Sequence, residues 1–98
     1  MAIQLDIAAA RKELQAQDIQ AIERTTAITW GGRAAAAFRL AAEADDADGR
    51  RKWLMDGENY RQEALEHAAM TDDFDFLRDV AAALATGRSE ALAIVRKA

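Results

Sequence analysis

The sequence contains neither cysteine nor proline, and glycine occurs at only five of its 98 positions. Without cysteine the chain has no disulfide scaffold and no thiolate metal site. Without proline, nothing forces a helix to end or kink at a fixed position. Together with the short length, these absences exclude a disulfide-rich mini-protein, a collagen-like chain and a two-domain enzyme.

Clustered positive charge is absent as well. The chain carries 17 acidic residues against 13 Lys and Arg, for a net charge of −4, and its isoelectric point is about 4.9. The single basic run, Arg50 to Lys52, follows Asp45, Asp46 and Asp48. Because proteins that bind nucleic acid depend on clustered Lys and Arg to contact phosphates, we expect no nucleic-acid partner.

Large apolar side chains are few for a folded domain. Alanine accounts for 25 of the 98 residues, and Leu, Ile, Val, Met, Phe, Trp and Tyr together supply only another 25. Small domains already bury a smaller fraction of their surface than large ones. We therefore expect a thin core, and a dependence on other chains to supply the burial that this chain lacks.

The sequence is rich in helix-forming residues, chiefly Ala, Leu, Arg, Glu and Gln, and its β-branched residues never alternate over the length of a strand. We predict a single all-α domain over residues 1–98, a small bundle of four to five helices. Asp6 is a good N-cap for the first helix, and Gly87 suits a left-handed stop after the fourth. The expected helices lie at about 7–17, 19–44, 50–70, 72–86 and 90–97, with 19–44 the long central helix. The sequence leaves open whether the first two are continuous.

Two stretches of the first two expected helices have features that favour packing against other helices. Gly31 and Gly32 together cost roughly 1–2 kcal/mol of helix propensity compared with two alanines. Residues 34–37 are all alanine, so this stretch has almost no polar face, and its small side chains let neighbouring backbones approach. The first helix has one apolar face, formed by Ile3, Ile7, Ala10 and Leu14.

No segment has the length and apolarity of a membrane span, which needs about 20 predominantly apolar residues. The least polar stretch, residues 27–40, is shorter and contains Arg33 and Arg39. Asp6 interrupts the only N-terminal stretch that could serve as a signal peptide. We expect a protein that makes no membrane contact and is not secreted by a signal peptide. It would act in the cytoplasm or be assembled into a particle inside the cell.

Residues suited to catalysis are scarce. His67 is the only histidine and Ser89 the only serine, and there is no glycine-rich loop to hold a phosphate. Nucleophilic catalysis needs an activated nucleophile and a base held next to it. We therefore predict no catalytic residue, no cofactor and no enzyme activity, and we assign no metal site.

One pair of side chains keeps a metal-binding alternative open. Glu63 and His67 lie four residues apart on one helix face, where they could bind a metal if other helices added ligands. The segment from Glu66 to Thr71 also resembles a local stretch of the encapsulated ferritin family, whose chains are short and helical. In that family the metal-binding helix carries a Glu three residues before the His, and the matching position here is Ala64. The alternative is therefore a ferritin-like protein that binds metal through Glu63 and His67 across a subunit interface, with Glu23 as a further candidate.

Aromatic side chains are the best candidates for a protein interface, because Trp and Tyr are enriched as anchors of protein–protein contacts. Four of the aromatic residues fall in the two central helices, and we predict them as interface candidates: Trp30, Phe38, Trp53 and Tyr60. The expected function is a non-enzymatic structural or assembly protein that contacts other proteins through its helices. It would form a homo-oligomer or belong to a larger particle, such as a phage head–tail connector or neck.

Overall fold

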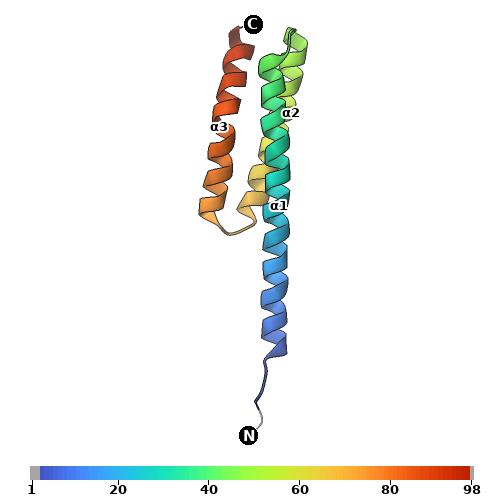
Figure 1. Ribbon diagram of the computed structural model, residues 1–98, viewed down its shortest axis with the longest axis vertical. Coiled ribbons are helices and arrows are strands. Elements are labelled where there is room, and N and C mark those ends of the chain that lie inside the picture. The colour runs from blue at the N-terminus through green and yellow to red at the C-terminus, as the bar shows by residue number, and fades with distance from the viewer. Residues whose placement is uncertain (1–2, 98) are drawn as a thin grey trace.

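A computed structural model of the protein describes residues 3–97 and shows three helices that pack side by side in an up-down-up order (Figure 1). They are α1 (Ile7–Glu43), α2 (Ala47–Ala69) and α3 (Phe74–Lys97). Residues 1, 2 and 98 of the predicted domain lie outside the described residues. No strand occurs in residues 3–97, so the all-α prediction is confirmed, whereas the prediction of four to five helices is wrong.

The first two predicted helices form a single helix. α1 runs without interruption through the polar stretch at residues 15–18, so the long helix is not confined to residues 19–44. Asp18 does not end it, because an exposed Asp costs a helix only a few tenths of a kcal/mol. The predicted cap is confirmed, since the carboxylate of Asp6 accepts a hydrogen bond from the backbone N–H of Ala9 at 3.0 Å. The 37 residues of α1 span about 55 Å.

The last two predicted helices also form one, and the predicted stop at Gly87 is wrong. Gly87 lies inside α3, and no glycine in the described part of the chain has a positive φ. A Cβ placed on Gly87 would lie 3.8 Å from the Cβ of Phe38 in α1. Packing against α1 thus keeps α3 helical across a residue that costs about 1 kcal/mol in a free helix.

Two short connections reverse the chain. Residues 44–46 join α1 to α2, so α2 begins before the predicted residue 50. Between α2 and α3, Asp72 takes the left-handed conformation, with a φ of 57°. Asp73 then caps α3, because its carboxylate accepts a hydrogen bond from the backbone N–H of Phe76 at 3.0 Å.

The core is built around one large side chain. Phe38 is fully buried, and its ring lies directly against Gly57 of α2, where an added Cβ would be 2.6 Å from two ring atoms. Most of the other buried residues are alanines, so the helices approach one another closely. Around the edge of this core lie the partly buried side chains of Trp30, Trp53, Leu54, Tyr60 and Val80.

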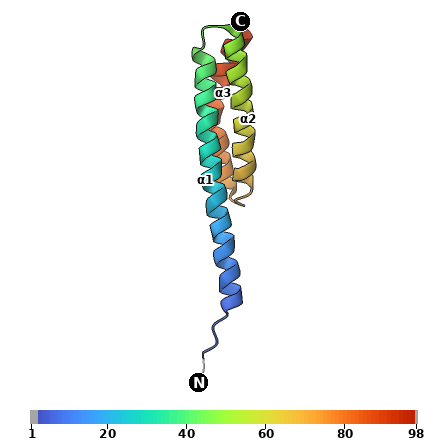
Figure 2. The same ribbon diagram turned by 90° about the vertical axis from the view of Figure 1, so that its right-hand side faces the viewer.

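The molecule is a rod because α1 is much longer than the other helices. Its principal extents are 77 × 19 × 14 Å, and its radius of gyration is 19.1 Å, where a compact chain of this length has about 13 Å. α2 and α3 cover only the C-terminal part of α1, and the N-terminal part projects alone (Figure 1, Figure 2). Residues 3–22 are all exposed, and we call residues 7–22 the free half of α1. None of the described helices is both long and apolar enough to cross a membrane.

Arg24 anchors α1 where the free half meets the bundle. Its guanidinium donates to the carboxylate of Asp73 at 2.9 Å and lies 4.3 Å from the centre of the Phe76 ring. The pKa of Asp73 is lowered, first by the hydrogen bond from the backbone N–H of Phe76 and then by the hydrogen bond from Arg24. One carboxylate thus caps α3 and also ties α1 to it.

We expect Gly57→Ala to lower the free energy of unfolding by about 1–3 kcal/mol, because the new methyl group would overlap the ring of Phe38. Gly31→Ala is the matched control, since a Cβ there meets no atom within 4 Å. Measured at a protein concentration low enough for the chain to be monomeric, that variant should be more stable than the natural protein by about 0.5–1 kcal/mol, because alanine is the better helix former. Urea unfolding followed by circular dichroism measures both. A Gly57→Ala protein as stable as Gly31→Ala would contradict the packing.

We expect the contribution of Asp73 to stability to depend on pH. A carboxylate with a lowered pKa stabilises the folded state above its unfolded pKa of about 3.9, and this contribution is lost as the pH falls through the folded pKa. Asp73→Asn keeps a capping side chain but cannot titrate. The stability advantage of the natural protein over Asp73→Asn should therefore shrink below about pH 4 in urea unfolding experiments. A difference that stays constant from about pH 7 to about pH 3 would show that the carboxylate is not held in this way.

Candidate functional site

One face of α1 carries an apolar stripe with a seven-residue spacing. Its large members, Ile7, Leu14 and Ile28, are 73%, 61% and 59% exposed. Residues seven apart are offset by about 20° around a straight helix, so the series winds slowly around α1, by about 100° in all from its first member to its last. Two helices that coil around each other can follow such a series as one continuous seam. We call this face the outer stripe, and it consists of Ile7, Leu14, Ala21, Ile28, Ala35 and Ala42. Ala42 is half-buried, and the other members are exposed.

The outer stripe lies beside a second seven-residue series that is fully buried in the bundle. This series consists of Ala27, Ala34 and Ala41. Each of these alanines is followed directly in the sequence by a member of the outer stripe, which lies about 100° further round the helix. α1 therefore has two apolar faces, and its own chain covers only one of them.

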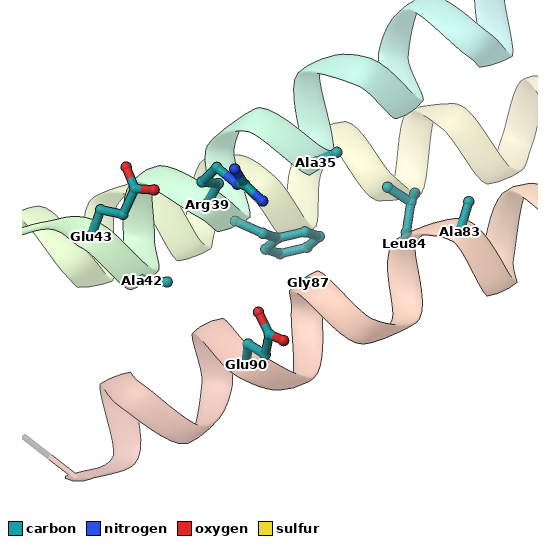
Figure 3. A pocket seen from close by; sticks show the side chains of 9 residues that line it. Ala35, Arg39, Ala42, Glu43, Ala83, Leu84, Gly87 and Glu90 are labelled. Carbon is teal, nitrogen blue, oxygen red and sulfur yellow. The ribbon is translucent and has the colours of Figure 1, made fainter.

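The C-terminal part of the outer stripe borders a groove of about 410 Å³ between α1 and α3. Figure 3 shows Ala35 and Ala42 on the α1 side of this groove, and Leu84 and Gly87 on the α3 side. The other residues that line it are Phe38, Arg39, Glu43, Ala83 and Glu90. Most of the lining is small or apolar, and its three charged side chains have a net negative charge.

The four aromatic interface candidates lie in the bundle and not on the free half of α1. Phe38 is fully buried, and Trp30, Trp53 and Tyr60 are half-buried and pack against the core. Trp30 stacks on Tyr60 with ring centroids 5.6 Å apart, which joins α1 to α2. Each aromatic side chain therefore has a structural role within the chain. Contact of their exposed edges with a partner stays a prediction.

The most exposed apolar residues are ones that sequence reasoning did not select as an interface. They are Ile3, Leu5, Ile7, Leu14, Ile19, Ile22, Ile28, Leu40, Met55, Met70 and Phe74. Part of the signal was available, because the spacing of Ile7, Ala10 and Leu14 marks one apolar face. Spacing alone, however, does not show whether other helices of the same chain cover that face.

A polar cluster joins α1 to α2 next to the free half. His67 Nδ1 lies 2.5 Å from a carboxylate oxygen of Glu23, and His67 Nε2 lies 3.8 Å from a carboxylate oxygen of Glu63. The structure thus brings together, within one chain, the three side chains that the metal-binding alternative places across a subunit interface. Residues 3–97 contain no group of three or more His, Cys, Asp or Glu side chains arranged to hold a metal ion.

The outer stripe runs along α1 from the free half into the α1 wall of the groove, whose other wall is α3. The candidate functional features of residues 3–97 are therefore the outer stripe, the groove and the polar cluster around His67. The chain matches no protein-family model, no curated protein and no solved structure.

Proposed function

We propose that this protein is a non-enzymatic assembly protein that packs the outer stripe of α1 against a helix of another protein chain. The observation that carries the proposal is the free half, which extends about 24 Å beyond the bundle with large apolar side chains on its surface. An isolated helix of this length is marginally stable in water. A partner helix that covers Ile7 and Leu14 would supply the burial that stabilises it.

The total exposed surface supports the same proposal. The chain exposes 7163 Å², whereas a compact protein of 10.7 kDa exposes about 5,500 Å². The excess of about 1,600 Å² per chain is larger than the roughly 800 Å² that each partner buries in a standard protein interface. The chain therefore has enough surplus surface for a stable interface without disturbing its own core.

A place in a larger particle is part of this proposal. A rod whose free helix reaches beyond its bundle suits a component such as a phage head–tail connector or neck, because the free helix can contact a neighbour at a distance from the core. In this setting the protein acts inside the cell or in a particle assembled there. Its partner is a protein, and neither a nucleic acid nor a membrane.

The alternative function, a ferritin-like metal-binding protein, is favoured by the approach of Glu23 and Glu63 to His67. We rank it second because each ring nitrogen of His67 already faces one of these carboxylates, so at least one contact would have to open for a metal. Metal analysis of the purified protein tests it. Stoichiometric iron or zinc that is lost in His67→Ala would support this alternative, whereas substoichiometric metal that His67→Ala does not change would exclude it.

We expect Leu14→Asp to weaken association by about tenfold or more, because a charge would replace an apolar side chain inside the contact. Met55→Asp is the matched control, since Met55 is similarly exposed, at 67% against 61%, but lies on α2. Association is measured in two ways. Sedimentation gives the mass of the purified protein, and native size separation gives the mass of the complex that contains it in extracts of the cells that produce it.

Circular dichroism first establishes that both variants retain their helices. The proposal requires that Leu14→Asp reduces the mass observed in at least one of the two measurements, while Met55→Asp changes neither. If Leu14→Asp leaves both masses unchanged, the outer stripe is not an interface and the proposal is wrong.

A further inference from the structure

The partner of the outer stripe can be inferred from α1 itself. We propose that it is α1 of a second copy of this chain, which runs antiparallel to the first. The free half of each copy lies in the groove between α1 and α3 of the other copy. This inference rests on the proposed function, and it specifies the partner and the geometry of the contact.

The directions of the three helices favour an antiparallel fourth helix. α1 and α3 run parallel to each other, and α2 runs antiparallel to both (Figure 1). A helix that lies in the groove and runs antiparallel to α1 and α3 completes a four-helix bundle in which all neighbouring helices are antiparallel. This places opposite ends of the helix dipoles side by side. A parallel helix in the same groove would align three dipoles.

The sizes of the side chains along the outer stripe also match an antiparallel pair. Most large members lie towards the N-terminal end of α1, and small members lie towards its C-terminal end. When two copies are aligned antiparallel about the middle of α1, each large member comes opposite a small one. The opposed pairs are Ile7 with Ala42, Leu14 with Ala35, and Ile28 with Ala21 of the other copy.

The free half has the length that this arrangement requires. Residues 7–22 span about 24 Å, and the 24 residues of α3, which form one wall of the groove, span about 36 Å. The midpoint of the pair falls between Arg24 and Thr25, next to the junction where the free half meets the bundle. The pair has two-fold symmetry, so each bundle covers the free half of the other copy and the same surfaces are used on both chains.

The dimer explains why residues 31 and 32 of α1 are both glycine, whereas packing within a single chain does not. A Cβ on Gly31 or Gly32 would meet no atom within 4 Å, so packing within the chain does not require glycine there. Both residues flank the outer stripe between Ile28 and Ala35, where the free half of the second copy would lie. The absence of side chains allows that helix to approach the backbone of α1.

Charge does not oppose the contact. The groove carries Arg39, Glu43 and Glu90, whose net charge is negative. The free half carries Arg11 and Lys12 against Glu13 and Asp18, so its net charge is zero. A neutral free half meets less repulsion in this groove than an acidic helix would.

Engineered cysteines test the geometry directly, because the natural chain contains none. Leu14→Cys and Ala35→Cys proteins are purified separately, mixed and oxidised. We expect a mixed disulfide between the two chains. Leu14→Cys alone should form little disulfide, because the antiparallel alignment separates its two copies by about 31 Å.

Ala36→Cys is the matched control for Ala35→Cys. Residue 36 is also an exposed alanine, but it lies about 100° away from residue 35 around α1. Mixed with Leu14→Cys, it should form about tenfold less disulfide than Ala35→Cys. Equal yields from both mixtures would contradict a defined contact at Ala35.

A distance measurement provides a second test that does not place a label in the contact. Lys12 is exposed and lies off the outer stripe, so Lys12→Cys can carry a nitroxide label. Double electron–electron resonance should give about 40 Å between the two labels in the antiparallel dimer. A parallel dimer with the two α1 helices in register would bring the labels within about 20 Å of each other.

The outcomes separate this inference from the proposed function. A protein that is monomeric up to about 100 μM overturns self-pairing. A dimer in which Leu14→Cys links to itself, or which lacks both the mixed disulfide and the long label distance, overturns the antiparallel geometry. In each case the proposed function is tested separately. It stands if Leu14→Asp lowers the mass of the purified protein or of the complex from cell extracts, and it fails if both masses stay unchanged.

Discussion

The contact between Phe38 and Gly57 sets the spacing of the bundle. Because residue 57 has no side chain, α2 lies directly against the ring of Phe38, and the alanines around this point can be buried. On the α3 side, Gly87 approaches the same residue. One large side chain of α1 therefore positions both other helices. Because the alanines around it bury little apolar area each, the fold depends on this contact more than a domain with many large core residues would.

The thin core and the exposed free half have a common cause. α1 places Phe38 in the core and several of its isoleucines and leucines outside it, where its own chain does not cover them. A small domain has only a few kcal/mol of net stability, so burial of even two or three such side chains by a partner changes the balance substantially. Stability of this chain is thus expected to rise with the concentration of whatever covers the free half.

The features predicted correctly from the sequence are those that depend on neighbouring residues. The cap at Asp6 and the helical class follow from local chemistry. The number of helices does not, because Gly87 is compatible with both a helix end and a helix interior, and only its contact with Phe38 decides between them. Similarly, the spacing around Leu14 predicts an apolar face, but whether that face is covered depends on where α2 and α3 end. The meeting of Glu23 with His67 depends in the same way on how α1 and α2 align.

Because of where the aromatic residues lie, fluorescence and circular dichroism report on different parts of the molecule. Trp30 and Trp53 both lie in the bundle, where Trp30 stacks on Tyr60, and the sequence has no aromatic residue before Trp30. Indole fluorescence therefore reports on the docking of α1 against α2 and is blind to the free half. The peptide absorption bands of the helices include residues 7–22 as well. The chain thus contains two intrinsic probes, of which one sees the bundle alone and the other sees the whole of α1.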